Sequence, residues 1–490
     1  MEPLIKTVDL RLKYPGGKQL FHDLTLSIHQ GEKILILGPS GSGKSTLLQV
    51  LSGLIPQVVE IPMVAKELAL PDSWGYVFQD PDSQFCMPFV DEELAFVLEN
   101  LAVPREYMQG KIDDLLLQVG LHLHDTHKSI RELSGGMKQR LAIASILAME
   151  PEVLFLDEPT AMLDPEGTEA VWDTIKKVGK EKTVIIVEHK IEHLRDFVGR
   201  VIVLDEKAEI IADGPTEVIF SECIPLLKKY GIWYPDVWQD YLKGRELKER
   251  QIVEEGPPII VLKNFSGFRG KERKIKVQEA VITKGEWITI IGENGAGKST
   301  LLESLMKLLK TEGKYELEGK GVKALPTDSI TFVFQNPEFQ FVTTSVFDEI
   351  AYTLRLKKVD EIEIKKRVEE LMVRFRLSHV KDHHPYQLSM GQKRRLSVAA
   401  AVVHQPKILL LDEPTFGQDS KNTFSMLEWL EMIKSEGGTI VMVTHDLHIV
   451  EEFADKIWLL EDGELASILS NEAFQSNQRS RREHHAVGAL

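Results

Sequence analysis

The sequence predicts an α/β fold composed of two similar domains, each organised around a mostly parallel sheet. One reason is a glycine-rich pattern, G-x-x-x-x-G-K-S, which occurs at 38–45 and 292–299, so that Lys44 and Lys298 lie 254 residues apart in a 490-residue chain. Each copy also follows an apolar run and precedes apolar residues at helical spacing. Further apolar runs, typical of buried parallel strands, occur at 153–156, 183–187, 408–411 and 439–443.

Each predicted domain begins its core with a strand, a glycine loop and a helix. Strand 34–37 and helix 47–54 flank the first loop, and strand 288–291 and helix 301–309 flank the second. Glycine allows such a loop to curl, so that backbone N–H groups and the start of the helix face the same point. This order of elements is the context that a phosphate-binding loop requires.

The rest of the two halves aligns with the glycine loops, and the offset drifts only between 254 and 256 residues. Gly256-Pro257-Pro258 predicts a break between the halves, because consecutive prolines cannot continue a helix. The last twenty residues have mixed charge and little apolar periodicity. We therefore predict a first domain at 1–245, a linker at 246–258, a second domain at 259–470 and a disordered tail at 471–490.

The net charge, the cysteines and the apolar runs of the chain limit the classes of protein to which it can belong. The chain has 59 Lys and Arg against 75 Asp and Glu, a net charge of −16, which argues against nucleic acid as a partner. Its two cysteines, Cys86 and Cys223, form no CxxC pattern, so we expect a reducing cytoplasm. The N-terminus shows no secretory signal, and no apolar run reaches the roughly 18 residues of a membrane helix. Any membrane-spanning part is expected to come from another chain.

The two glycine loops are expected to bind the phosphates of ATP. Their N–H groups and the following helix N-terminus favour an anion, and Lys44 and Lys298 are expected to reach the β and γ phosphates. Ser45 and Ser299 are expected to offer hydroxyls to Mg²⁺. The predicted nucleotide-binding residues of the loops are Gly38, Pro39, Ser40, Gly41, Ser42, Gly43, Lys44, Ser45, Thr46, Gly292, Glu293, Asn294, Gly295, Ala296, Gly297, Lys298, Ser299 and Thr300.

Paired acids follow one buried strand in each half. Asp157 and Asp412 each end an apolar run, where a lone carboxylate would be costly to bury without a cation such as Mg²⁺. Glu158 and Glu413 come next and are expected to polarise the attacking water as general bases.

Between loop and acids, the halves contain Leu133-Ser134-Gly135-Gly136-Met137-Lys138-Gln139 and Leu388-Ser389-Met390-Gly391-Gln392. Each serine lies 23 residues before its aspartate, and this order and spacing resemble the ATP-binding-cassette ATPases over nearly the whole chain. The resemblance implies two P-loop NTPase domains, each a mostly parallel sheet core with a helical signature subdomain and an N-terminal antiparallel β part. It also implies that the signature helix contacts the γ-phosphate through Ser134, Gly135, Gly136, Ser389 and Gly391.

The same resemblance implies further roles. Tyr14 and Phe268 would stack on adenine, and Asp164 and Asp419 would belong to the loops that link the two sites. Gln79 and Gln335 would touch Mg²⁺, whereas His189 and His445 would hold the γ-phosphate and steady the neighbouring glutamate. The implied catalytic set is Glu158, Glu413, His189, His445, Gln79 and Gln335, and the implied metal set is Ser45, Gln79, Asp157, Ser299, Gln335 and Asp412.

Cassettes of this family pair head to tail, so Lys44 is expected to share a nucleotide with Ser389, and Lys298 with Ser134. The second signature departs from the pattern, because Met390 stands where the first glycine is expected. Its side chain would crowd the γ-phosphate, and a glycine's conformational freedom would be lost. We therefore expect the site built on Lys44 and Met390 to turn over more slowly.

Each half also contains a segment of the form x-Pro-acid-x-Gln-aromatic, at 80–85 and 336–341. These segments resemble those of the energy-coupling-factor subfamily, where a short helix grips the coupling helices of a transmembrane scaffold. Proline can open such a helix, and its acid could face an arginine of the partner. The resemblance implies a bacterial protein on the cytoplasmic face of the membrane, with a scaffold subunit and a small substrate-binding membrane subunit, for a vitamin or precursor such as thiamine or hydroxymethylpyrimidine.

Two other functions remain open from the sequence. The tandem ATPase of a sugar importer has a similar length, but usually has a damaged second catalytic set. A soluble tandem cassette protein that acts on ribosomes would be expected to have a long basic linker and no coupling segment.

Overall fold

The computed structural model describes residues 2–17, 19–161, 163–189, 191–245 and 256–477. The chain divides into two compact units, Met1–Val237 with Asp419–Lys421, and Trp238–Gln418 with Asn422–Leu490. Each unit combines a parallel sheet, an antiparallel region and a group of helices, which confirms the predicted fold class.

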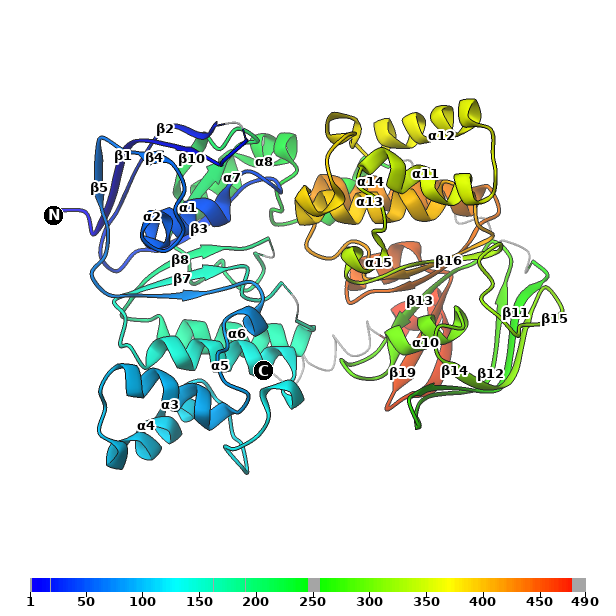
Figure 1. Cartoon of the computed structure of the whole chain (residues 1–490), viewed down its shortest axis with the longest axis horizontal. Helices are drawn as coiled ribbons and strands as arrows, with labels where there is room; N and C mark the ends of the chain where they lie inside the picture. The colour runs from blue at the N-terminus through cyan, green and yellow to red at the C-terminus, as the bar shows by residue number, and fades with distance from the viewer. Residues whose placement is uncertain (1, 18, 162, 190, 246–255, 478–490) are drawn as a thin grey trace. The chain divides into compact units, whose positions relative to one another are not determined.

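The first unit contains a six-stranded sheet in the order β10-β9-β3-β8-β7-β6, parallel except for β10 (Figure 1). A smaller antiparallel sheet pairs β1 with β2, β4 and β5. The strands are β1 (Ile5–Lys13), β2 (Gln19–Ile28), β3 (Lys33–Leu37), β4 (Met63–Val64), β5 (Glu67–Ala69), β6 (Trp74–Val77), β7 (Val153–Asp157), β8 (Thr183–Val187), β9 (Arg200–Leu204) and β10 (Ile210–Pro215).

Helices α3, α4 and α5 lie on the side of the parallel sheet away from β1 and β2 (Figure 1). They form the expected helical subdomain, in which α5 packs on β6, α3, α4 and α6. The helices of this unit are α1 (Lys44–Leu51), α2 (Leu54–Gln57), α3 (Val90–Asn100), α4 (Arg105–Gln118), α5 (Gly135–Leu147), α6 (Pro165–Val178), α7 (Thr216–Glu222) and α8 (Ile224–Tyr230), with short 3-10 helices η1 (Pro81–Ser83) and η2 (Ile130–Glu132).

Continuous apolar character explains why β3, β7 and β8 lie at the centre of the sheet. All five residues of β7 and of β8 are buried, as the uninterrupted runs predict for strands covered on both faces. β3 pairs in parallel with β8 and β9, so that its C-terminal end delivers the glycine loop to the edge where β7 delivers its acids.

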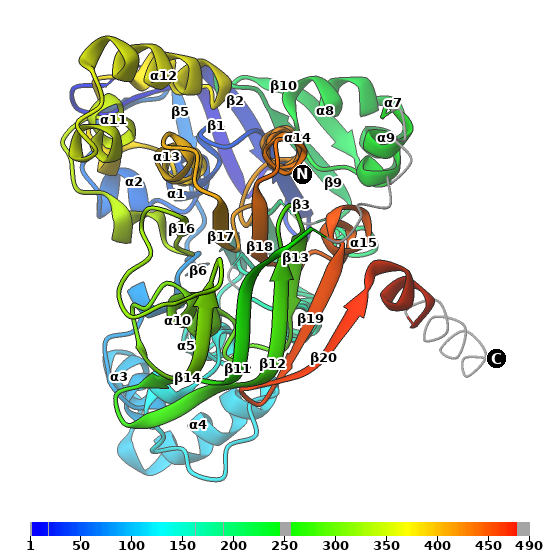
Figure 2. The ribbon, with the colours of Figure 1, turned by 90° about the vertical axis from the view of Figure 1, so that its right-hand side faces the viewer.

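The second unit repeats this plan within one ten-stranded sheet, in the order β15-β14-β11-β12-β20-β19-β13-β18-β17-β16 (Figure 2). Strands β13, β16, β17, β18 and β19 form its parallel part, and β11, β12 and β14 its antiparallel part. The bounds are β11 (Pro258–Arg269), β12 (Glu272–Thr283), β13 (Trp287–Ile291), β14 (Lys310–Leu317), β15 (Lys320–Gly321), β16 (Ile330–Val333), β17 (Ile408–Asp412), β18 (Thr439–Val443), β19 (Lys456–Glu461) and β20 (Glu464–Ser470).

The helices of the second unit include a group, α11 to α13, that matches α3 to α5 (Figure 2). Their bounds are α9 (Val237–Lys243), α10 (Lys298–Leu305), α11 (Val346–Leu356), α12 (Glu361–Arg374), α13 (Met390–Val402), α14 (Ser420–Ser435) and α15 (Leu447–Phe453), with 3-10 helices η3 (Pro337–Gln340), η4 (Ser378–Val380) and η5 (Pro385–Gln387). Within the described ranges, no helix has both the length and the apolar character needed to cross a bilayer.

The division between the units falls at Val237, eight residues before the predicted end of the first domain. Its cause is the aromatic segment of α9, where Trp238 and Tyr241 pack on Phe424 with ring centroids 5.0 and 3.9 Å apart. β11 begins at Pro258, where the linker was predicted to end. The rest of that linker, 246–255, lies outside the described residues.

The predicted disordered tail is wrong for 471–477, which form a helix against the second unit. Phe474 is buried with Val450, Ala454 and Ile457, and the Asn471 side chain donates to the carbonyls of Val450 and Ala454 at 2.8 and 2.9 Å. One apolar residue and one amide therefore anchor a segment whose composition is otherwise polar. The remainder, 478–490, lies outside the described residues.

Candidate nucleotide-binding sites

The first glycine loop joins β3 to α1 in the predicted arrangement. Lys44 is 6% exposed, and its Nζ donates to the carbonyls of Gly38 and Pro39 at 3.0 and 3.1 Å. Burial lowers the pKa of this ammonium, while the charge of Glu158 opposes the shift. The lysine thus lies inside the loop, where phosphate oxygens could replace the carbonyls as its acceptors.

The second loop has the same arrangement between β13 and α10. Lys298 Nζ donates to the carbonyls of Gly292 and Glu293 at 2.7 and 2.8 Å. Gly292 has a φ of 155°, and a Cβ there would lie 2.2 Å from the carbonyl oxygen of Leu460. The close approach of β19 therefore requires glycine at the start of this loop.

Two of the three residues predicted to hold Mg²⁺ in each unit, the loop serine and the strand-end aspartate, lie close together. Ser45 Oγ donates to Asp157 Oδ1 at 2.8 Å, and in the second unit Ser299 lies close enough to Asp412 to oppose the rise in the pKa of that carboxyl. A hydroxyl beside a carboxylate supplies the oxygen ligands that Mg²⁺ prefers, so the donor set fits this ion. Burial raises the pKa of Asp412 and raises that of Asp157 to about 6, because desolvation penalises the charged form of a carboxylate.

Tyr76 is a residue of the first site that motif analysis missed. Its hydroxyl donates to Asp157 Oδ2 at 3.0 Å, so both oxygens of this carboxylate accept a hydrogen bond. Phe332 occupies the corresponding place in β16 and cannot donate. Tyr76 lies three positions before Gln79 in a strand of mostly apolar residues. The sequence of that strand indicates burial, but it does not indicate that the tyrosine hydroxyl reaches Asp157.

Three predicted catalytic residues come together in the first unit. Glu158 accepts from Gln79 Nε2 at 2.9 Å, and its other oxygen lies 3.2 Å from His189 Nε2. Burial alone would raise the pKa of Glu158, but His189 and Lys44 outweigh it and hold this pKa below its ordinary value. The carboxylate is therefore ionised at neutral pH, as a general base requires.

The second unit brings together only part of the same set. Glu413 Oε1 lies 3.5 Å from His445 Nε2. Gln335 is exposed, and it makes no hydrogen bond to Glu413 within the described residues. Both glutamates adopt a positive φ, 47° for Glu158 and 49° for Glu413, so the turn after the acidic strand is the same in both units.

The signature serines begin helices, as expected. Ser134 caps α5 by accepting from the N–H of Met137, and Ser389 caps α13 in a reciprocal capping box with Gln392. Met390 lies in the first turn of α13, is 43% exposed and is not among the residues with positive φ. The expected loss of glycine's backbone freedom therefore does not apply, and only the bulk of the side chain remains.

Four further predicted residues keep structural contacts of their own. Tyr14 is 39% exposed, and its hydroxyl lies 2.9 Å from Thr46 Oγ1. The Phe268 ring lies under Lys310, whose Nζ is 5.1 Å from the ring centroid. Asp164 caps α6 through the N–H of Gly167, and Asp419 is buried just before α14. Adenine stacking and a link between sites remain predictions for these residues.

The two segments at 80–85 and 336–341 form the predicted short helices, η1 and η3. Each acid forms an ion pair with its own signature helix, because Asp82 contacts Lys138 of α5 at 2.8 Å and Glu338 contacts Lys393 of α13 at 2.5 Å. A contact of these acids with a partner arginine remains a prediction. In the first unit, η1 and α5 border a cavity of about 110 Å³ that Gln79 also lines.

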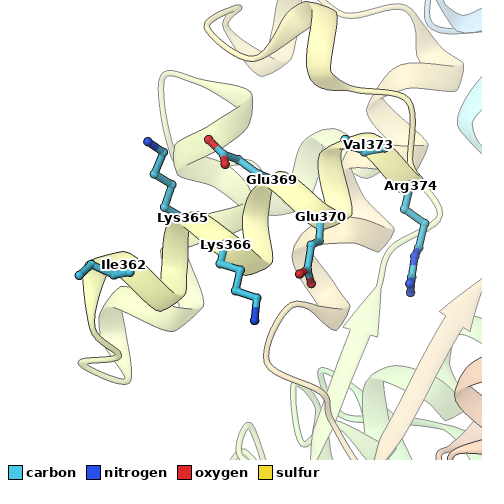
Figure 3. A pocket seen from close by; sticks show the side chains of 7 residues that line it. All are labelled: Ile362, Lys365, Lys366, Glu369, Glu370, Val373 and Arg374. Carbon is cyan, nitrogen blue, oxygen red and sulfur yellow. The ribbon is translucent and has the colours of Figure 1, made fainter.

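A wider hollow, about 760 Å³, follows α12 and lies apart from all predicted site residues. Its lining comes from one helix, and Lys366, Glu370 and Arg374 point to the same side (Figure 3). Charged side chains spaced by four residues indicate a solvated helix surface rather than a nucleotide site. This hollow is therefore not a candidate nucleotide site.

Comparison with known proteins agrees with this geometry. The profile of the family described as ABC transporter matches residues 21–161 and 276–416. "Putative HMP/thiamine import ATP-binding protein YkoD" of Bacillus subtilis is 37% identical over 487 residues, 92% of this chain and 88% of its own. A "Putative ABC transporter ATP-binding protein" of Streptococcus pneumoniae is 34% identical and covers 96% of this chain and 92% of its own.

Among solved structures, an archaeal ribosome recycling factor in complex with a ribosomal stalk protein has a TM-score of 0.64. It covers 96% of this chain and 92% of its own at 21% identity, so it shows the fold alone.

Two matched family segments and relatives over nearly the whole length define the class of protein. The chain belongs to the ABC transporter family and is a tandem ATP-binding protein, an ATPase coupled to transport.

Proposed function

We propose that this ATPase energises a membrane importer of the energy-coupling-factor type, from the cytoplasmic face of a bacterial membrane. Its partners would be a transmembrane scaffold and a small substrate-binding membrane subunit. The observation that carries the proposal is the coupling segment, defined as 80–85 in the first unit and 336–341 in the second. Both copies form a capped short helix beside the signature helix.

The coupling segments combine anchored and exposed groups. Gln84 and Gln340 donate to carbonyls of α5 and α13 at 3.4 and 2.9 Å, which fixes each segment to its signature helix. Asp82 and Phe339 remain 57% and 76% exposed, respectively. A partner helix could therefore meet an acid or an aromatic ring on an otherwise fixed surface.

The coupling segment is continuous with the candidate catalytic site. Gln79, which donates to Glu158, directly precedes Asp80, the cap of η1. A partner that moves η1 would therefore change the hydrogen bond at the proposed general base. In this proposal Ser45, Asp157 and Gln79 hold Mg²⁺ in the first site, Ser299, Asp412 and Gln335 hold it in the second, and Glu158 and Glu413 polarise water.

The proposed cargo is a vitamin or vitamin precursor such as thiamine or hydroxymethylpyrimidine. It is supported by the relative whose name refers to HMP/thiamine import. A cytoplasmic ATPase does not contact the cargo, so side chains of this chain add nothing to that assignment.

Affinity purification from detergent-solubilised membranes tests the partner class. We expect the wild-type chain to recover a multi-spanning scaffold and a small membrane protein. The paired variant Asp82→Asn with Glu338→Gln removes the acid of each coupling segment and is expected to recover much less scaffold, while it still binds ATP. A matched control, Asp72→Asn, changes an exposed acid outside the segment and is expected to recover as much as wild type.

Recovery of ribosomes without membrane proteins would contradict the proposal and favour the ribosome-associated alternative. Recovery of a scaffold together with a sugar-binding protein would instead favour a sugar importer. Uptake assays with labelled thiamine and hydroxymethylpyrimidine would then test the cargo.

A further inference from the structure

Arg394 is a buried arginine in the signature helix of the second unit. It is 7% exposed and projects from α13 toward the strand end that carries Asp412 and Glu413. Burial lowers the pKa of Arg394 to about 10, against the opposing charges of Glu413 and Asp412, so that the guanidinium remains charged at neutral pH. Burying this charge is costly, and its contacts show what compensates for it.

The guanidinium contacts both ends of the short turn after the acidic strand. Arg394 Nη1 donates to the carbonyl oxygen of Glu413 at 2.6 Å, and the guanidinium carbon lies 5.7 Å from the centroid of the Phe416 ring. The N–H of Phe416 donates to the same carbonyl at 3.3 Å. The arginine thus holds the turn 413–416 through a charge-assisted hydrogen bond and a cation–π contact.

The turn that Arg394 contacts is strained, because Glu413 has a φ of 49°. A residue with a side chain pays strain in this left-handed region, and the conformation persists when surrounding contacts determine it. The direction of the Glu413 carboxylate depends on that backbone.

The first unit has neither the arginine nor the phenylalanine at the matching positions. Gln139 replaces the arginine and donates to the carbonyl of Phe78 at 3.3 Å, next to Gln79. Ala161 replaces Phe416 and offers no ring. The two sites therefore stabilise different segments: the first stabilises the backbone before its glutamine, and the second stabilises the turn of its glutamate.

We propose that Arg394, together with Phe416, is a positioning residue that fixes the turn 413–416 and thereby aims the Glu413 carboxylate at the attacking water. This role rests on the proposed function of Glu413 as general base.

The test uses the full-length protein carrying Glu158→Gln, so that steady-state hydrolysis reports on Glu413. Into this parent we introduce Arg394→Gln, which restores the residue of the first unit, Arg394→Lys, which retains one donor, and Phe416→Ala. Arg395→Gln is the matched control, because the neighbouring arginine donates to the carbonyl of Phe375, outside the turn.

We expect Arg394→Gln to lower kcat about tenfold, the size typical of losing one charge-assisted hydrogen bond, with KM for ATP and the melting temperature near those of the parent. Arg394→Lys and Phe416→Ala should give intermediate kcat values, and Arg395→Gln should match the parent. An unchanged kcat in Arg394→Gln would overturn the proposal, as would equal losses of kcat in Arg394→Gln and Arg395→Gln.

If Arg394→Gln fails to fold, the lysine and alanine variants carry the same test. Glu413→Gln in the wild-type background separates the general-base role of Glu413 from the positioning role of Arg394. If it leaves hydrolysis unchanged, the proposed role of Glu413 fails, whereas a large loss there with no effect at Arg394 refutes the positioning role alone.

Discussion

At the residue scale, the two cassettes place the same acids in different surroundings. Asp157 accepts hydrogen bonds from Ser45 and Tyr76, whereas Phe332 takes the place of the tyrosine near Asp412. Gln79 and His189 contact the Glu158 carboxylate, whereas Glu413 has His445 beside its carboxylate and Arg394 on its backbone carbonyl. Equivalent chemistry is thus supported by different contacts.

Asp157 predicts a pH dependence for magnesium binding in the first cassette. Burial raises the pKa of Asp157 to about 6, so the group takes up a proton at a higher pH than an ordinary carboxylate. Mg²⁺ requires the ionised form, and its apparent affinity should fall as the pH drops through about 6. The measurement uses the Glu413→Gln variant, in which the first cassette carries the remaining hydrolysis. Its ATPase rate is recorded against Mg²⁺ concentration at pH 5.5 and at pH 7.5.

Tyr76→Phe should extend that loss to higher pH, because removing a hydrogen bond to the ionised carboxylate raises the pKa of Asp157 further. Tyr315→Phe is the matched control, since its hydroxyl donates to the carbonyl of Leu305 instead. Identical magnesium titrations for Tyr76→Phe and its parent would show that this hydroxyl does not support the site.

Motif spacing predicted the acids and the loop lysines and serines, because these residues end strands or open helices at one edge of a sheet. Gln79 and His189, which contact Glu158, were indicated by the family resemblance, and the hydrogen bond from Gln79 to Glu158 was not predicted. Motif spacing did not predict Tyr76 or Arg394. Tyr76 lies in a strand and Arg394 in a helix whose hydrophobic patterns indicate only that these positions are buried. Their hydrogen bonds join residues far apart in the sequence, so they depend on how the elements pack.

At the element scale, individual proline and capping residues predicted the short helices better than the overall composition of a segment did. Proline after Asp80 and Asn336 predicted η1 and η3, and both caps accept an N–H two residues further on. The ion pairs of these segments with α5 and α13 join residues more than 50 positions apart, and sequence spacing gives no indication of them. Polar composition likewise hid the helix at 471–477.

Phe474 is expected to anchor this C-terminal helix. Phe474→Ala would remove a buried ring from the cluster with Val450, Ala454 and Ile457, and should cost about 3 kcal/mol of unfolding free energy. Thermal denaturation would show a lower melting temperature for the second unit. Glu472→Ala, at an exposed position of the same helix, is the control. A disordered segment, as composition predicted, would leave both variants equal to wild type.

At the scale of the whole molecule, duplication yields two cassettes that share a plan but not every contact. Both units deliver a glycine loop, an acidic strand end and a capped signature helix. Internal alignment predicted this repetition, since homologous halves repeat their hydrophobic pattern. Domain limits were less predictable, because the aromatic segment at α9 packs with the second unit rather than the first.

The differences between the two cassettes predict that the two nucleotide sites hydrolyse ATP at unequal rates. If the cassettes pair head to tail, as the family resemblance implies, Met390 would add bulk beside the nucleotide of Lys44. Glu158→Gln should therefore leave the faster site working, and Glu413→Gln the slower one. We expect at least a threefold lower steady-state rate in Glu413→Gln. Equal residual rates would contradict this asymmetry. Met390→Gly in the Glu413→Gln background should then raise the rate if side-chain bulk is the cause.

We propose that two glutamates, one in each cassette, supply the general bases of this transport ATPase. Phosphate release by the purified full-length double variant Glu158→Gln, Glu413→Gln, measured together with its affinity for ATP, tests this role. We expect hydrolysis to fall by at least about a hundredfold with ATP binding preserved, because a glutamine cannot accept the proton of the attacking water. Hydrolysis at the wild-type rate in this double variant would show that neither glutamate is the base.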